Sequence, residues 1–214
     1  MPGTRTATAQ TSRRRTGTRA ALLALPLAAG LLGVTAPAQA TTSGQGLRPA
    51  SLTCEGKGVD TGAEARHRAE TFVRAPLRTV WSLQTDVADW PSWQKPAAPM
   101  TVERLDHGPL RERSRFQATV RIPPTPATPP GTVVITSTVQ QLRYGQCLRW
   151  TGPAEGPGYR IDGVHVWNFV KVPGGVLVRT EESHRGPQAD PGSDMGLETW
   201  LRDLKTAAEA DPCH

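Results

Sequence analysis

The sequence predicts an α+β fold in which an antiparallel sheet of about seven strands packs against one long C-terminal helix. Three observations predict this class. Between residues 65 and 184 the chain repeats short segments rich in β-branched and aromatic residues, separated by turn-forming residues. Two short helical segments fit between the first and second of these strands. Near the C-terminus, apolar residues recur at the spacing of an amphipathic helix.

Residues 1–40 have the composition of a secretory signal peptide. Arg13–Arg15 form a basic start, Ala20–Val34 form an apolar run, and Ala38–Ala40 match an A-x-A cleavage site. The apolar run has 15 residues, whereas a bilayer span needs about 20. We therefore expect cleavage after Ala40, a secreted protein, and no stable membrane insertion after cleavage. The arginine pair at Arg13 and Arg14 leaves both general and twin-arginine export open.

Cleavage would leave 174 of the 214 residues, the length of one domain. Residues 41–62 are rich in Gly, Ser and Thr and are expected to form a flexible lead, and residues 63–214 are expected to form the folded domain. The leader holds five of the 25 Lys and Arg residues and none of the 19 acidic ones, which leaves a formal charge of +1. No basic cluster therefore indicates a nucleic-acid partner.

The first strand is predicted over residues 65–74, and two short helices follow it. Pro76 fits the first turn of a helix because that position needs no internal N–H bond. Asp86 can cap the next turn, and Pro91 redirects the chain between two tryptophans. The first helix has its apolar positions at Val80, Trp81 and Leu83.

Six further strands complete the predicted sheet. They cover residues 100–105, 113–122, 132–142, 146–152, 159–172 and 176–184. In the second of these, Phe116, Ala118 and Val120 alternate with polar residues, the pattern of a strand with one apolar face. Residues 123–130 contain five prolines and must form a connection, and residues 173–175 form a Pro-Gly-Gly turn.

A C-terminal helix is predicted to start after Ser193 or Asp194, either of which can cap it. Its apolar stripe needs a partner surface, and the sheet is the only large one available. The stripe consists of Leu197, Trp200, Leu201, Leu204, Ala207 and Ala208.

Two segments of the chain resemble a known superfamily. They are VRAPLRTVWSLQTDVADWPSWQ after the first strand and GVHVWNFVKVPGGVLVRTEESHRG near the end. Together with the C-terminal helix, they resemble the START-like (SRPBCC, helix-grip) superfamily, in its polyketide cyclase/dehydrase-like branch, over most of residues 65–210. The resemblance implies a curved antiparallel sheet wrapped around the C-terminal helix. It also implies a cavity between them that holds an apolar or aromatic small molecule.

Strand alternation suggests which side chains would face such a cavity. On the strand 159–172, Ile161, His165, Trp167 and Phe169 share one face, the more aromatic of the two. On the next strand Glu182 matches the glutamate of the family best, whereas a shift of one residue would select Glu181. The predicted ligand-binding residues are Trp93, Phe116, His165, Trp167, Phe169, Glu182, Leu197, Trp200, Leu201 and Leu204.

His165 and Glu182 are the candidate catalytic pair, since a carboxylate can orient an imidazole for proton transfer. The alternative is a His that only makes a structural hydrogen bond. Ser183 and His184 do not indicate a hydrolase, because adjacent strand residues point to opposite faces and no G-x-S-x-G motif is present. No nucleotide-binding motif and no metal-ligand spacing appear, so no cofactor and no metal are expected.

Export to an oxidising compartment would allow one disulfide among the three cysteines. We expect Cys54 to pair with Cys213, because this bond would attach both ends of the domain to its body. Cys147 lies in a strand, where a small buried thiol is common. The alternative is that all three cysteines remain reduced.

Three functions are compatible with the sequence. The first is an exported protein that binds a small hydrophobic or aromatic molecule. The second is a cyclase/dehydratase-like enzyme that uses acid/base groups in the same cavity, although polyketide intermediates are normally built in the cytoplasm. The third is a secreted interaction protein whose cavity is closed. The sequence indicates neither the oligomeric state nor the identity of the ligand.

Overall fold

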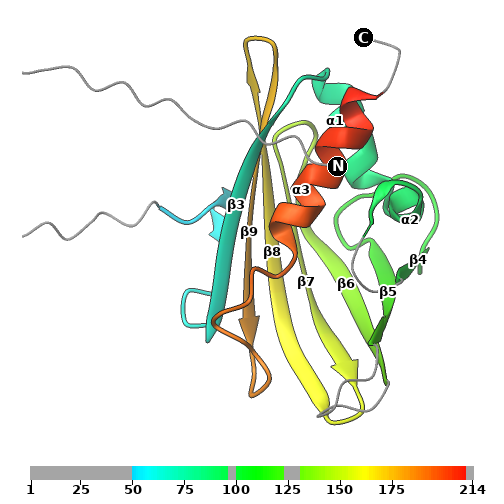
Figure 1. Ribbon diagram of the computed structural model, residues 1–214, viewed down its shortest axis with the longest axis vertical. Coiled ribbons are helices and arrows are strands. Elements are labelled where there is room, and N and C mark those ends of the chain that lie inside the picture. Colours follow the sequence, from blue (N-terminus) through cyan, green and yellow to red (C-terminus); the bar gives the residue numbers. More distant parts are fainter. Residues whose placement is uncertain (1–49, 96–99, 123–130, 211–214) are drawn as a thin grey trace, which may run out of the picture. The chain divides into compact units, whose positions relative to one another are not determined.

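The computed structural model describes residues 50–95, 100–122 and 131–210. The expected leader (1–40), the proline-rich connection (123–130) and Cys213 lie outside these residues. The main sheet has seven antiparallel strands in the order β3-β9-β8-β7-β6-β5-β4 (Figure 1). Its strands are β3 (Ala65–Val73), β4 (Met100–Arg104), β5 (Arg115–Ile122), β6 (Gly131–Arg143), β7 (Cys147–Gly156), β8 (Tyr159–Val172) and β9 (Gly175–Arg185).

From β4 to β9 each strand pairs with the next in the chain, and β3 completes the sheet beside β9. The turn between β8 and β9 consists of Pro173 and Gly174, as the sequence predicts, and Gly174 has a positive φ of 82°. A register shift between Val139 and Gln141 marks a bulge in β6, where β-strands bend. The α+β class and the order of the elements along the chain, both predicted from the sequence, are confirmed.

Four helical segments lie on one face of this sheet (Figure 1). They are α1 (Leu77–Thr85), the short 3₁₀ segment η1 (Val87–Asp89), α2 (Trp90–Trp93) and α3 (Leu197–Glu209). The predicted cap of α3 is wrong: its N-cap is Gly196 in the left-handed conformation, and no side chain caps it. Ser193 and Asp194 instead accept bonds from the backbone N–H groups of Met195 and Gly196, which shapes the turn before the helix.

The hydrophobic core lies between α3 and the sheet. Leu201, Leu204 and Ala208 of α3 are almost completely buried there, together with Val73 and Phe169 of the sheet. Full burial of one such aliphatic or aromatic side chain contributes about 1.5–3 kcal/mol. The helix is therefore held by its apolar stripe, as its spacing predicts.

A small hairpin, β1 (Thr53–Cys54) and β2 (Lys57–Gly58), precedes the sheet. Leu52 and Val59 beside this hairpin pack on Val166 of β8. Residue 166 alternates with the core-facing residues 165 and 167, so the hairpin covers the opposite face of the sheet.

The disulfide differs from the predicted one. Cys54 is bonded to Cys147 at the start of β7, with Cα atoms 5.4 Å apart, so the pairing of Cys54 with Cys213 is wrong. The physical reason is the position of the hairpin, which is also bonded to the sheet through Asn168 Nδ2 and Arg149 Nε. The order of residues along the chain does not reveal this position.

Candidate functional site

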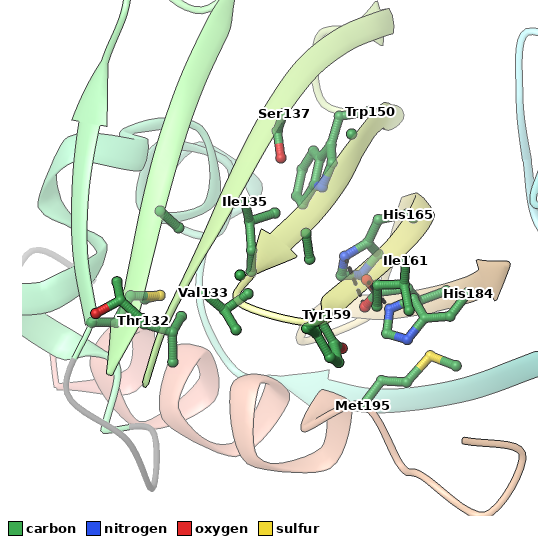
Figure 2. Close-up of a pocket in the computed structure, with 18 of the residues that line it drawn as sticks. Thr132, Val133, Ile135, Ser137, Trp150, Tyr159, Ile161, His165, His184 and Met195 are labelled. Carbon is green, nitrogen blue, oxygen red and sulfur yellow. Dashed lines mark hydrogen bonds and ion pairs between the residues drawn. The ribbon is translucent and has the colours of Figure 1, made fainter. Parts of the chain in front are cut away.

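The structure contains a cavity of about 630 Å³ beside the N-terminal end of α3. Figure 2 shows Thr132 and Val133 at one end of it and His165 and His184 at the other. Most of its wall is contributed by alternate residues of β5 to β8, all on the helix-bearing face of the sheet. The apolar part of the wall includes Met100, Ala118, Val120, Val133, Ile135, Ala154, Ile161 and Met195.

Four aromatic side chains form one wall of the cavity. Trp90 of α2 contacts Trp200 of α3 edge-on, with ring centroids 4.8 Å apart, and Phe116 of β5 lies 5.3 Å from Trp90. Trp150 of β7 lies 5.6 Å from Phe116. Edge-to-face aromatic contacts of this kind fix the rings in place. The four rings therefore form one continuous aromatic surface on this side of the cavity.

Two strand glycines deepen the cavity floor. Gly152 of β7 and Gly163 of β8 are direct partners in the sheet, and both line the cavity. A Cβ atom on Gly152 would lie 2.1 Å from the carbonyl oxygen of Thr136, which no real structure allows. A glycine is required at position 152, and the cavity extends to the backbone there.

The polar end of the cavity contains a carboxylate between two imidazoles. Oε2 of Glu182 lies 3.3 Å from Nδ1 of His165, and Oε1 accepts a hydrogen bond from Nε2 of His184 at 3.0 Å. Nε2 of His165 lies 2.6 Å from the hydroxyl of Thr180. We call Glu182, His165 and His184 the polar cluster.

Burial and the neighbouring side chains together determine the charges in the polar cluster. Burial lowers the pKa of His165 below its usual value, although the Glu182 carboxylate acts in the opposite direction. Burial alone would raise the pKa of Glu182, but the imidazoles of His165 and His184 outweigh it and lower that pKa. At neutral pH, His165 is therefore uncharged and Glu182 is ionised.

The two histidines differ in what they present to the cavity. Nδ1 of His165 faces the carboxylate of Glu182, and Nε2 faces the hydroxyl of Thr180, which donates to the carbonyl oxygen of Val166 at 3.3 Å. Both nitrogens of His165 are thus occupied within the protein. His184 donates from Nε2 to Glu182, and its Nδ1 has no hydrogen-bond partner among the described residues. The available nitrogen belongs to His184.

Four of the predicted site residues line the cavity: Phe116, His165, Glu182 and Trp200. Glu182 lines the cavity, whereas Glu181 lies on the opposite face, where it accepts bonds from the backbone N–H of Leu52 and from Arg66.

Six other predicted residues are buried without lining the cavity, because it lies beside the start of α3 rather than under its full length. They are Trp93, Trp167, Phe169, Leu197, Leu201 and Leu204.

Sequence reasoning missed several residues of the cavity. His184 lies two positions after Glu182, so strand alternation already placed both on one face. Trp150 is the direct partner of His165 in the sheet, which only the strand register reveals. Trp90, which is not among the predicted ligand-binding residues, both donates from Nε1 to the carbonyl of Gln84 and lines the cavity.

Residues 50–95, 100–122 and 131–210 contain neither a metal-binding cluster nor a membrane-spanning helix. No group of three or more His, Cys, Asp or Glu side chains there is placed to hold a metal ion. No helix in the same ranges is long and apolar enough to cross a membrane.

Comparison with known proteins identifies related sequences and folds. Residues 48–209 match the family described as polyketide cyclase / dehydrase and lipid transport. A protein from Chromobacterium violaceum has a TM-score of 0.56 and 16% identity, with 68% of this chain and 98% of that chain covered. A hypothetical protein from Helicobacter pylori has a TM-score of 0.53 and 19% identity, with coverage of 74% and 99%. At such identities the likeness shows the fold alone, and no curated protein matches the sequence.

Proposed function

The chain belongs to the polyketide cyclase / dehydrase and lipid transport family, and on that premise we propose that it is an exported protein that binds one small hydrophobic or aromatic molecule. The observation that supports this most strongly is the cavity of about 630 Å³ with an apolar wall and one polar end. Small-molecule sites commonly have volumes of about 300–1,000 Å³ and a few placed polar groups in an apolar lining.

The volume of the cavity and its aromatic wall favour a ligand-binding function over an interaction protein with a closed interior. Packed protein interiors contain few voids larger than a water molecule, so a space of this size needs an occupant or solvent. The aromatic wall of Trp90, Phe116, Trp150 and Trp200 offers flat apolar surface to a ligand. These features disfavour the third function, an interaction protein without a cavity.

Export is supported by two independent observations. The leader at residues 1–40 has a basic start, an apolar run and a cleavage motif. The Cys54–Cys147 disulfide is a bond that persists in oxidising compartments and is rare in the cytosol. We therefore place the mature protein, starting at Thr41, outside the cytoplasm.

Native mass spectrometry of the exported protein tests this function. The chain is expressed with its leader, and the protein is purified from the extracytoplasmic fraction without detergent. We expect a chain that starts at Thr41 and that carries one small apolar molecule, released by denaturation. Ala118→Trp, which fills the cavity, should remove the bound mass. Thr101→Trp, which introduces tryptophan at an exposed residue of the adjacent strand, should retain it. A ligand-free wild type that also fails to bind added apolar compounds would refute the proposal.

A second function, proton transfer on a bound ketone, is favoured by one observation. Glu182 orients His184 so that Nδ1 is available to take a proton from a carbon next to a carbonyl. The test is deuterium exchange at that carbon of an enolisable aromatic ketone, followed by NMR. We expect exchange above the background rate, lost in His184→Ala and retained in His67→Ala, which changes a histidine outside the cavity lining. Deuterium exchange no faster than the background rate in the wild-type protein would exclude this activity.

A further inference from the structure

We propose that the molecule in this cavity carries a hydrogen-bond donor, a hydroxyl or a protonated amine, at the end that meets Glu182 and His184, and that carboxylate-bearing molecules are rejected. This inference rests on the proposed binding function and adds the chemical class of the ligand. It follows from the charge of the cavity and from the direction of its hydrogen bonds.

The described lining of the cavity contains no lysine or arginine side chain that could pair with an anionic ligand. Glu182 is its one carboxylate, and none of its described residues is Lys or Arg. Residues 123–130, which connect β5 to β6, are proline, threonine and alanine only, so they bring no charge either. A carboxylate that enters would lie near the ionised Glu182 in a largely apolar space, where like charges repel strongly.

The free positions of the polar cluster accept hydrogen bonds. When the ring of His184 carries one proton, on the Nε2 that is bonded to Glu182, its Nδ1 presents a lone pair to the cavity. The carboxylate oxygens of Glu182 can each accept a further bond. Its side chain is 19% exposed, so a ligand can reach it from the cavity. A hydroxyl or an ammonium group satisfies these acceptors, whereas a carboxylate satisfies none of them.

The remaining polar side chains of the wall do not reverse this preference. Ser137, Thr132 and Tyr159 carry hydroxyls, which both donate and accept. Burial and the charge of Glu182 both raise the pKa of Tyr159, so its hydroxyl stays neutral. These residues can hold a second polar group of the ligand, but the selection between donor and carboxylate belongs to Glu182 and His184.

Isothermal titration of three matched compounds tests the inference. Naphthylmethylamine, naphthylmethanol and naphthoate share one ring system and differ in the polar group. At neutral pH we expect the amine and the alcohol to bind at least about tenfold more tightly than naphthoate. If the amine binds more tightly than the alcohol, charge causes the selection against naphthoate. If the amine and the alcohol bind with equal affinity, hydrogen bonding causes it.

Two variants locate the effect. Glu182→Gln removes the charge at nearly constant shape. In this variant the amine and the alcohol should bind less than about threefold more tightly than naphthoate. Glu155→Gln removes an exposed carboxylate of β7 outside the cavity lining and should leave the preference unchanged.

The possible failures are distinguishable. If naphthoate binds the wild type as well as the amine and the alcohol do, the inference is wrong while the binding function stands. The same holds if the preference survives in Glu182→Gln. If none of the three compounds binds, the binding function itself is refuted. Should Glu182→Gln fail to fold, the wild-type ranking alone decides the matter.

Discussion

At the residue scale, the two histidines of the polar cluster have different roles, which the sequence does not distinguish. His165 is 2% exposed, and the two nitrogens of its ring face polar groups of the protein, Glu182 and Thr180. Its role is to position Glu182, and Glu182 in turn positions His184. The residue that faces a ligand with an available nitrogen is therefore His184, although His165 is the more deeply buried.

The depressed pKa of His165 should make stability depend on pH. Below about pH 6.5 the unfolded state binds a proton that the folded state rejects, so the free energy of unfolding should fall with decreasing pH down to the folded-state pKa. The slope should approach about 1.4 kcal/mol per pH unit. Urea denaturation between about pH 5 and pH 7 measures it.

Two variants test whether His165 causes this pH dependence of stability. His165→Gln should flatten it, whereas His67→Gln, which changes a partly exposed histidine, should not. The lowered pKa of Glu182 acts in the same direction, but only below its usual value of 4.5, so it stays outside this window. Equal slopes in the wild type and in His165→Gln would show that His165 does not titrate as stated.

Gly152 provides a second prediction at this scale. Gly152→Ala should destabilise the protein by about 1–3 kcal/mol, because the added methyl overlaps the carbonyl of Thr136 and the strands must separate. Gly131→Ala is the matched control, since a Cβ at that strand glycine meets nothing within 4 Å. Thermal unfolding of both variants measures the difference. An unchanged Tm in Gly152→Ala would show that the close approach of β6 and β7 is not required.

At the element scale, the hairpin β1–β2 is held to the sheet by the disulfide and a small apolar contact. The cysteines are 93 positions apart, so their bond closes a long loop in the unfolded chain. Cys54→Ser with Cys147→Ser should lower the free energy of unfolding by about 2–5 kcal/mol. Urea denaturation under oxidising conditions measures the loss.

Cys213 supplies the control for this prediction. Cys213→Ser should leave the stability unchanged, and peptide mapping of the unreduced protein should recover Cys54 linked to Cys147. A linked pair of Cys54 and Cys213 would overturn the observed connectivity and restore the one predicted from the sequence.

Elements were predictable where local patterns determine them. The alternation in residues 113–122 and the Pro-Gly-Gly turn locate β5 and the β8–β9 hairpin correctly, because side-chain period and turn chemistry are local properties. The cap of α3 and the partner of Cys54 were not predictable. Both depend on where the chain lies in space, which the order of residues does not encode directly.

At the scale of the whole molecule, the cavity results from a mismatch between a long sheet and a shorter helix. The core-facing side chains of α3 fill one part of the interface, and the alternate residues of β5 to β8 beside its N-terminal end line the cavity. The sequence therefore predicted a cavity and four of its residues. It placed Leu201 and Leu204 in the lining because it could not show which part of the sheet the helix covers.

Titration of the mature protein with an apolar fluorophore tests the presence of a ligand-sized cavity most directly. We expect saturable binding of one fluorophore per chain, with quenching of the tryptophan fluorescence from Trp90, Trp150 and Trp200. Binding should be lost in Ala118→Trp and retained in Thr101→Trp. A linear, unsaturable signal, or full binding in Ala118→Trp, would show that this cavity does not hold a ligand.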